Sequence, residues 1–185
     1  MGSKRKIHEE WLVLRCQLGE AEAYRELVTM IEKRLFYYIR MLVSRETDAY
    51  DILQEVWLTV FKKIRKLRDP KAFHTWIYRI AHDLAVSFIR QEIRHEKIQE
   101  SYAEEALTQN DEPLLELEDM IQVHHALNRL NPLHREVLAL YFVEDMSYEE
   151  IAQVAGCNLG TVKSRMHYAK KELRHVLEAR NGEKK

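Results

Sequence analysis

The segment 147–173, SYEEIAQVAGCNLGTVKSRMHYAKKEL, constrains the fold more than any other part of the chain. Ser147 is a favourable helix N-cap, and Glu150 three residues later completes the pattern of a capping box. Gly156 lies where a helix end favours a left-handed residue, and Asn158 can cap a following helix. Apolar residues then recur at helical spacing at Val162, Met166, Ala169 and Leu173. The pattern predicts two short helices joined by a tight turn.

The second of these helices is expected to turn a polar and basic face away from its apolar residues. That face consists of Thr161, Lys163, Ser164, Arg165, His167 and Lys171, with Arg165 at its edge. A helix-turn-helix places such a face in the major groove of DNA. An ordinary helical hairpin with a solvated basic face is the alternative, but the agreement of the turn, the caps and the basic face favours DNA binding.

Few glycines and prolines interrupt the chain, which has five and three of them in 185 residues. Hydrophobic residues make up 46% of the sequence, and no run alternates with the period of two that a half-buried strand requires. We therefore expect an all-α protein of one or two small domains. No apolar run is long enough to span a bilayer, and no signal-peptide pattern opens the chain. Cys16 and Cys157 are expected to be free thiols in a reducing cytoplasm.

The net charge of −1 is unevenly distributed. Residues 1–95 hold 18 basic and 13 acidic side chains, and residues 121–185 hold 10 and 8. Residues 96–120 hold one basic and nine acidic side chains, and this segment has weak periodicity and contains Pro113. The sequence predicts a domain over 1–97, an acidic linker over 98–118 and a second domain over 119–185.

Four helical patterns cover the amino-terminal domain, over about 7–18, 21–43, 47–67 and 69–95. Gly19 ends the first pattern, and Asp69 with Pro70 fits the N-cap and first residue of the fourth. Four helices of this length can bury one core.

An acidic face is predicted near the start of the third helix. Asp48, Asp51 and Glu55 share this face at spacings of three and four residues, and Gln54 lies beside them. Carboxylates near a helix N-terminus are favourable in themselves, so the face is either helix-end stabilisation or a docking surface for a basic partner. Catalysis by paired carboxylates is disfavoured, because no His, Cys or Gly-rich element accompanies these residues. Metal binding is disfavoured because one helix face rarely supplies enough ligands.

Basic and aromatic residues are interleaved between positions 62 and 79. The basic residues are Lys62, Lys63, Arg65, Lys66, Arg68, Lys71 and Arg79. The ring-bearing residues are Phe73, His74, Trp76 and Tyr78. Basic groups attract phosphates and aromatic faces stack on unpaired bases, so the segment is a candidate for binding single-stranded nucleic acid. Equally, the rings can be core residues and the basic groups solvated.

Together these segments resemble a bacterial extracytoplasmic-function (ECF) sigma factor, the smallest kind of promoter-recognition subunit of RNA polymerase. DAYDILQEVWLTVFKKI resembles the conserved second-region helix of that family, and the stretch through TWIYRIAHDLA resembles the promoter-melting segment. LNPLHREVLALYFVEDMSYEEIAQVAGCNLGTVKSRMHYAKKELRHVL resembles the carboxy-terminal domain. The resemblance covers about 20–95 and 120–177, with three motifs in the order and spacing of the family.

The resemblance implies which residues bind core RNA polymerase and promoter DNA. It assigns to the polymerase clamp Asp48, Asp51, Gln54 and Glu55. It assigns to the minus-ten element Lys66, Arg68, Lys71, Phe73, His74, Trp76, Arg79 and Asp83. It assigns to the minus-thirty-five element Thr161, Lys163, Ser164, Arg165, His167 and Lys171. Members of the family commonly have Asn where this chain has Asp83 and often have Asp where it has Ser87, so the base preference at minus ten cannot be carried over.

The family consists of non-enzymatic transcription initiation factors. The resemblance therefore implies no cofactor, metal, small-molecule substrate or membrane insertion, a cytoplasmic location, and an anti-sigma factor as a further partner. A stand-alone regulator of the response-regulator or quorum type would need an α/β domain before the helix-turn-helix. A nucleic-acid-processing enzyme would need a metal cluster, a phosphate loop or a nucleophile–base pair, and the sequence has no such motif. A helical adaptor that binds only proteins would not need a basic recognition face.

Overall fold

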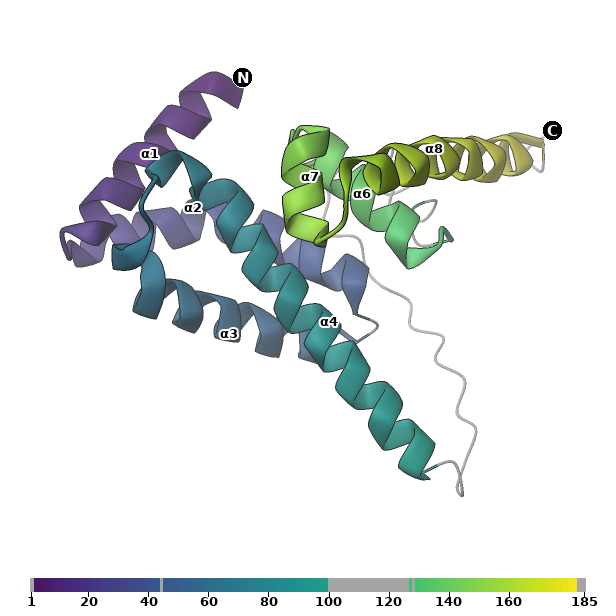
Figure 1. Ribbon diagram of the computed structural model, residues 1–185, viewed down its shortest axis with the longest axis horizontal. Helices are drawn as coiled ribbons and strands as arrows, with labels where there is room; N and C mark the ends of the chain where they lie inside the picture. The colour runs from purple at the N-terminus through teal and green to yellow at the C-terminus, as the bar shows by residue number, and fades with distance from the viewer. Residues whose placement is uncertain (1, 44, 100–126, 128, 183–185) are drawn as a thin grey trace.

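The structure, a computed structural model, describes residues 2–43, 45–99, 127 and 129–182. Its α-helices, drawn in Figure 1, are α1 (Gly2–Gln17), α2 (Ala21–Leu42), α3 (Glu46–Lys63), α4 (Phe73–Gln99), α6 (Pro132–Phe142), α7 (Tyr148–Ala155) and α8 (Leu159–Gly182). Two short 3-10 turns, Ile64–Lys66 and Pro70–Ala72, connect α3 to α4. The described ranges contain helices and no strand, which confirms the predicted all-α class.

Gly19 ends α1, and its φ of +92° lies in the left-handed region. Its amide donates to the carbonyl of Cys16 (3.0 Å), and the amide of Glu20 donates to the carbonyl of Arg15 (3.2 Å), the two bonds of a Schellman motif. A Cβ at Gly19 would lie 2.8 Å from Nη2 of Arg65, so the glycine also lets the α3–α4 connection approach this backbone. The predicted end of the first helix is confirmed at this glycine.

The third helix ends at Lys63, before the predicted end at about residue 67, because the chain tightens into a 3-10 turn. The side-chain amide of Gln17 donates to the carbonyls of Ile64 (3.0 Å) and Leu67 (2.8 Å). These bonds tie the connection to α1. Because they join residues far apart in the sequence, the local pattern does not reveal them.

The fourth helix begins later than predicted and runs further. Asp69 accepts a hydrogen bond from the amide of Lys71 (3.0 Å), as an N-cap should, but the turn that follows is 3-10. Regular α-helix starts at Phe73 and continues to Gln99, beyond the predicted end at about residue 95.

The amino-terminal helices α1–α4 enclose a core of fully buried side chains. It includes Leu12, Leu27, Ile31, Leu35, Phe73 and Ile77. Tyr38 of α2 and Tyr78 of α4 meet edge to face in the same core, with ring centroids 5.2 Å apart. Burying one large apolar side chain contributes about 1.5–3 kcal/mol, so this core is the main force that holds the four helices together.

The carboxy-terminal helices α6–α8 bury a second set of apolar side chains. It includes Val137, Leu138, Leu140, Ile151, Val154, Val162, Met166 and Ala169. Three of these residues are the inward positions predicted for the last helix, and Leu173 is partly buried against them. The helix α6 packs on α2 and α7 packs on α4, so the two sets of helices are in direct contact (Figure 1).

The structure describes only the first two residues of the predicted linker over 98–118. Residues 98–99 form the end of α4, and residues 100–118 lie outside the described residues, so the domain boundaries stay predictions. Within the described part of the chain, no helix is both long and apolar enough to cross a membrane.

Candidate functional site

The turn between α7 and α8 has the geometry of the predicted helix-turn-helix. The amide of Ser147 donates to Oε2 of Glu150 (2.7 Å), and the amide of Glu150 donates to Oγ of Ser147 (3.2 Å), which completes the capping box. Gly156 caps α7 with a φ of +61°. Oδ1 of Asn158 accepts from both the amide (2.8 Å) and the hydroxyl (2.9 Å) of Thr161. Local hydrogen bonds therefore determine where both helices meet the turn.

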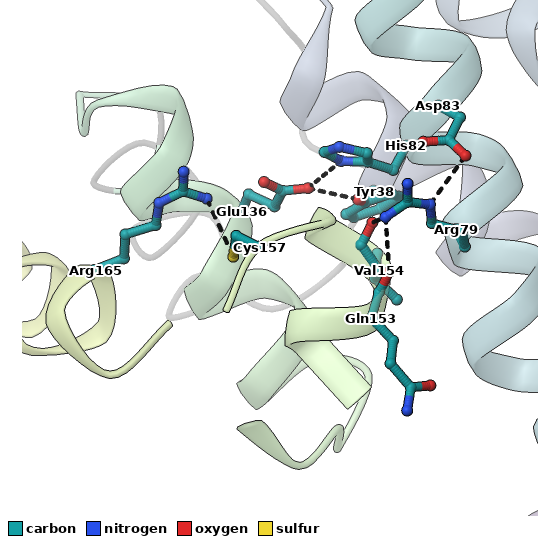
Figure 2. Close-up of polar contacts among 9 residues, drawn as sticks. All are labelled: Tyr38, Arg79, His82, Asp83, Glu136, Gln153, Val154, Cys157 and Arg165. Carbon is teal, nitrogen blue, oxygen red and sulfur yellow. Dashed lines mark hydrogen bonds and ion pairs between the residues drawn. The ribbon is translucent and has the colours of Figure 1, made fainter. Parts of the chain in front are cut away.

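The solvent side of α8 carries most of the residues predicted to read the minus-thirty-five element. Exposed on this side are Lys163, Ser164, His167 and Lys171. Thr161 is half-buried at the start of the helix, and Arg165 is half-buried with Nη1 3.9 Å from Sγ of Cys157 (Figure 2). The exposed groups are cations and hydrogen-bond donors, which are the groups that contact phosphates and base edges.

The helix α3 exposes Asp51, Gln54 and Glu55, as predicted for the polymerase-binding face. The same face continues into two apolar residues, because Leu58 is 51% exposed and Phe61 is 67% exposed. Sequence reasoning missed these two residues. The sequence could have revealed them. Positions 58 and 61 follow the exposed positions 51, 54 and 55 at helical spacings of three and four residues, and they are not among the apolar positions predicted to face the core.

Asp48 is separate from this exposed face. It is only 7% exposed, and its Oδ2 accepts a hydrogen bond from Nε of Arg45 (2.8 Å). Arg45 also donates from Nη2 to Glu92 on α4 (2.7 Å). Asp48 therefore binds the residue that precedes α3, and Arg45 makes the contact with α4; the structure does not bring Asp48 together with Asp51 and Glu55 on the surface as predicted.

The residues predicted for the minus-ten element divide into a surface set and a buried set. Exposed on the surface are Lys66, Arg68, Lys71 and Asp83, with Trp76 and Arg79 half-buried. Lys71, Trp76 and Arg79 line a groove of about 460 Å³. Its other wall includes Glu150 and Gln153 of α7. The groove thus lies between the predicted DNA surface and the helix-turn-helix.

Phe73 and His74 belong to the buried set. Phe73 is fully buried in the amino-terminal core, so in this structure its ring does not stack on a base as predicted. His74 is 8% exposed, and its Nδ1 lies 3.3 Å from Oε2 of Glu9. Burial lowers the pKa of His74, but the hydrogen bond to Glu9 and the charges of Glu9 and Glu144 outweigh this effect and raise the pKa overall.

Arg79 connects the predicted minus-ten surface to α7. Its Nε donates to Oδ2 of Asp83 (2.9 Å), one helical turn further along α4. Its Nη1 donates to the carbonyls of Gln153 (2.8 Å) and Val154 (3.1 Å), as Figure 2 shows. One guanidinium therefore binds a carboxylate of its own helix and the backbone of another.

The candidate site is a set of surfaces suited to binding macromolecules. Among the described residues, no group of three or more His, Cys, Asp or Glu side chains is arranged to hold a metal ion. An acidic face on α3, a groove beside α4 lined by both basic and acidic side chains, and a basic face on α8 are surfaces that can recognise macromolecules through charge and hydrogen bonding.

Two family models match the chain over the two sets of helices. The model described as Sigma-70 region 2 matches residues 27–95, and the model described as Sigma-70, region 4 matches residues 120–173. The fold is similar to that of the sigma factor RpoE, co-crystallised with the anti-sigma factor NepR from Bartonella quintana. That likeness has a TM-score of 0.72 at 22% identity and covers 85% of this chain and 98% of RpoE.

Relatives of known class match almost the whole chain. The RNA polymerase sigma-H factor of Pseudomonas aeruginosa is 30% identical over 181 residues, covering 92% of this chain and 94% of that protein. The ECF RNA polymerase sigma-E factor of Haemophilus influenzae is 28% identical over 184 residues, covering 94% and 97%. A region 2 unit followed by a region 4 helix-turn-helix defines a transcription factor of the sigma-70 class. Within that class, the chain belongs to the ECF RNA polymerase sigma factors.

Proposed function

We propose that this sigma factor directs core RNA polymerase to one class of promoters through three separate surfaces. The exposed face of α3 binds the polymerase, the groove side of α4 binds the opened minus-ten element, and the exposed face of α8 reads the minus-thirty-five duplex. The observation that carries the proposal is the exposure pattern of α8. Its outward side chains Lys163, Ser164 and His167 contribute nothing to the core, yet they present the groups that a DNA-reading helix needs.

The proposed partners follow from this role. They are core RNA polymerase, promoter DNA and an inhibitor of the anti-sigma class, since RpoE from Bartonella quintana was crystallised with such an inhibitor. The protein would act in the cytoplasm and catalyse no reaction of its own. A stand-alone regulator with an α/β receiver is disfavoured, because the described amino-terminal residues form helices and the region 2 model matches them.

Run-off transcription tests the proposed function directly. Core polymerase with the full-length protein is incubated with genomic fragments, and transcript start sites are mapped. We expect specific starts that are absent with core polymerase alone, and weak, salt-sensitive binding of promoter duplex by the free protein. No added starts, together with tight sequence-specific binding by the free protein at physiological salt, would favour a stand-alone repressor or activator.

The recognition helix can be tested with two alanine variants. Lys163→Ala or Arg165→Ala is expected to reduce transcription from a promoter that depends on its upstream element. Loss of a bidentate base contact costs about 1–3 kcal/mol and relaxes specificity at one position, whereas loss of a phosphate contact weakens all sequences alike. Lys33→Ala on the exposed side of α2 is the matched control. Normal transcription by both variants would mean that α8 does not read the upstream element.

Asp83 can be tested for a role in choosing the minus-ten base. Asp83→Asn keeps the shape of the side chain and removes the charge that pairs with Arg79. The pair is surface-exposed, so its loss should change stability by less than about 1 kcal/mol. We expect the variant to change the ranking of minus-ten sequences in a transcription assay. A uniform change across all sequences would assign Asp83 to the surface pair alone.

A further inference from the structure

The outer side of α1 carries a row of exposed apolar side chains. This row, the α1 stripe, consists of four large residues that are 47–80% exposed: Ile7, Trp11, Leu14 and Leu18. The opposite side of the helix is buried in the amino-terminal core through Leu12, Val13 and Cys16. A helix that packs on one body needs only one apolar face, and α1 has two. A contiguous apolar surface left in water marks an interaction site.

The position of α1 leaves the stripe accessible to another molecule. The helix packs on α2 and on the two 3-10 turns of the α3–α4 connection. It lies at the edge of the molecule, away from α6, α7 and α8 (Figure 1). The surfaces proposed for polymerase and promoter DNA belong to α3, α4 and α8, so they do not account for the stripe.

The spacing of the stripe is that of a coiled-coil seam. Its residues recur at intervals of four, three and four, which places Ile7 and Leu14 at d positions and Trp11 and Leu18 at a positions of a heptad. Leu18 directly follows α1, and its amide still donates to the carbonyl of Leu14 (3.2 Å), so the helical register extends through it. The partner that fits such a seam is another helix. Because α1 is already held on the core, pairing does not pay for folding this helix.

The charges beside the seam favour a second copy of the same helix. The e positions are His8 and Arg15, and the g positions are Glu10 and Gln17. In a parallel pair, each g residue faces the e residue five positions later in the other helix, so Glu10 faces Arg15 of the second copy, and two-fold symmetry forms this pair twice. In an antiparallel pair, e faces e, and His8 would face Arg15 without attraction. The flanking charges are therefore complementary in the parallel arrangement.

Arg15 is already positioned beside the seam with donors to spare. Its Nε donates to Oε2 of Glu20 (2.7 Å), and its Nη2 lies 2.6 Å from the same oxygen. The guanidinium carbon lies 4.4 Å from the centroid of the Trp11 ring. Among the described residues, none accepts a hydrogen bond from Nη1 of Arg15, and none forms an ion pair with Glu10. Both groups can therefore pair across a dimer without breaking a contact within the chain.

We propose that α1 is a homodimerisation helix, through which two copies of this protein pair in parallel along the α1 stripe, with Glu10 of each copy bound to Arg15 of the other. The seam spans less than two heptads, so the dimer belongs to the class of small, weak and transient complexes, with a dissociation constant in the micromolar range. It is a property of the free protein and is independent of the function proposed above.

Sedimentation equilibrium of the full-length protein over micromolar to submillimolar concentrations tests the dimer. Leu14→Glu places two carboxylates opposite each other at the middle of the seam and should raise the dissociation constant more than tenfold. Leu133→Glu on α6 is the matched control, because Leu133 is 48% exposed and Leu14 is 50% exposed. The control should dimerise like wild type. A monomeric wild type throughout this range would overturn the proposal and leave the stripe to a helix of another protein, and equal weakening by both variants would remove the dimer from α1.

The parallel arrangement is tested by charge exchange. Glu10→Arg brings two cations together in each flanking pair and should weaken the dimer, and the double variant with Arg15→Glu exchanges the charges and should restore it toward wild type. Because these residues do not face each other in an antiparallel pair, absence of rescue would overturn the parallel arrangement.

A disulfide cross-link provides the second test of the arrangement. Equivalent d residues meet across a parallel seam, so Leu14→Cys should form a covalent dimer on mild oxidation. Lys33→Cys on the exposed side of α2 is the control, and both proteins keep the native Cys16 and Cys157. Non-reducing electrophoresis measures the covalent dimer. A yield no higher for Leu14→Cys than for the control would contradict parallel pairing through α1.

Discussion

Reversing Asp51 and Glu55 to lysine is expected to abolish assembly of the sigma factor with core RNA polymerase. Both side chains are exposed on α3 and neither has a role in the core, so the helices should remain intact. If this face docks on a basic partner, the reversal brings like charges together, which costs several kcal/mol at an interface. Size-exclusion chromatography of the mixture measures assembly, and circular dichroism of the free variant measures helicity.

The matched control is Glu22→Lys with Glu26→Lys, two exposed carboxylates at the same spacing on α2. Their ion pairs with Arg25 and His8 are on the surface, so their loss should cost little. Assembly at wild-type affinity by the α3 variant would show that its carboxylates only stabilise the helix. Leu58→Ala extends the test to the exposed apolar residue further along the same face.

Phe73→Ala is expected to lower the free energy of unfolding by about 3–5 kcal/mol, the usual cost of removing a buried aromatic side chain. The residue is fully buried, so truncation leaves a cavity among α1–α4. Urea denaturation followed by circular dichroism measures the change as a lower midpoint with an unaltered slope.

Trp76 provides the comparison for this experiment. It is half-buried and lines the groove beside Arg79, and its ring lies 6.0 Å from that of Phe73. Trp76→Ala should lose less stability than Phe73→Ala and should reduce promoter opening at temperatures where the fold is intact. If Phe73→Ala were as stable as wild type but defective in opening, its ring would have to leave the core and reach DNA.

Several features of the fold were predictable from the sequence because they depend on short-range interactions. The capping box of Ser147 and Glu150, the left-handed Gly156 and the cap at Asn158 each involve residues within three or four positions of one another. The inward positions of α8 follow from helical spacing in the same way. The helix-turn-helix and the all-α class could therefore be predicted before any tertiary contact was known.

Side-chain roles that depend on distant partners could not be predicted from local spacing. The pattern placed Phe73 and Trp76 in one aromatic cluster, and only the packing of α1–α4 shows that one ring is core and the other borders a groove. Likewise, Asp48 shares the helical spacing of Asp51 and Glu55, but it is only 7% exposed and accepts a hydrogen bond from Arg45.

The contact between the amino-terminal and carboxy-terminal helices is a further feature that only the tertiary structure revealed. Glu136 and Glu144 look like ordinary solvated residues of an amphipathic segment, and their partners Tyr38, His82 and Arg34 lie more than fifty positions earlier in the chain. Helical spacing specifies which face of a helix is apolar, but it does not specify which distant surface covers a polar residue. The sequence alone therefore determined the elements and their caps, while the tertiary structure decided which charged groups are buried and which of the predicted DNA-binding residues are exposed.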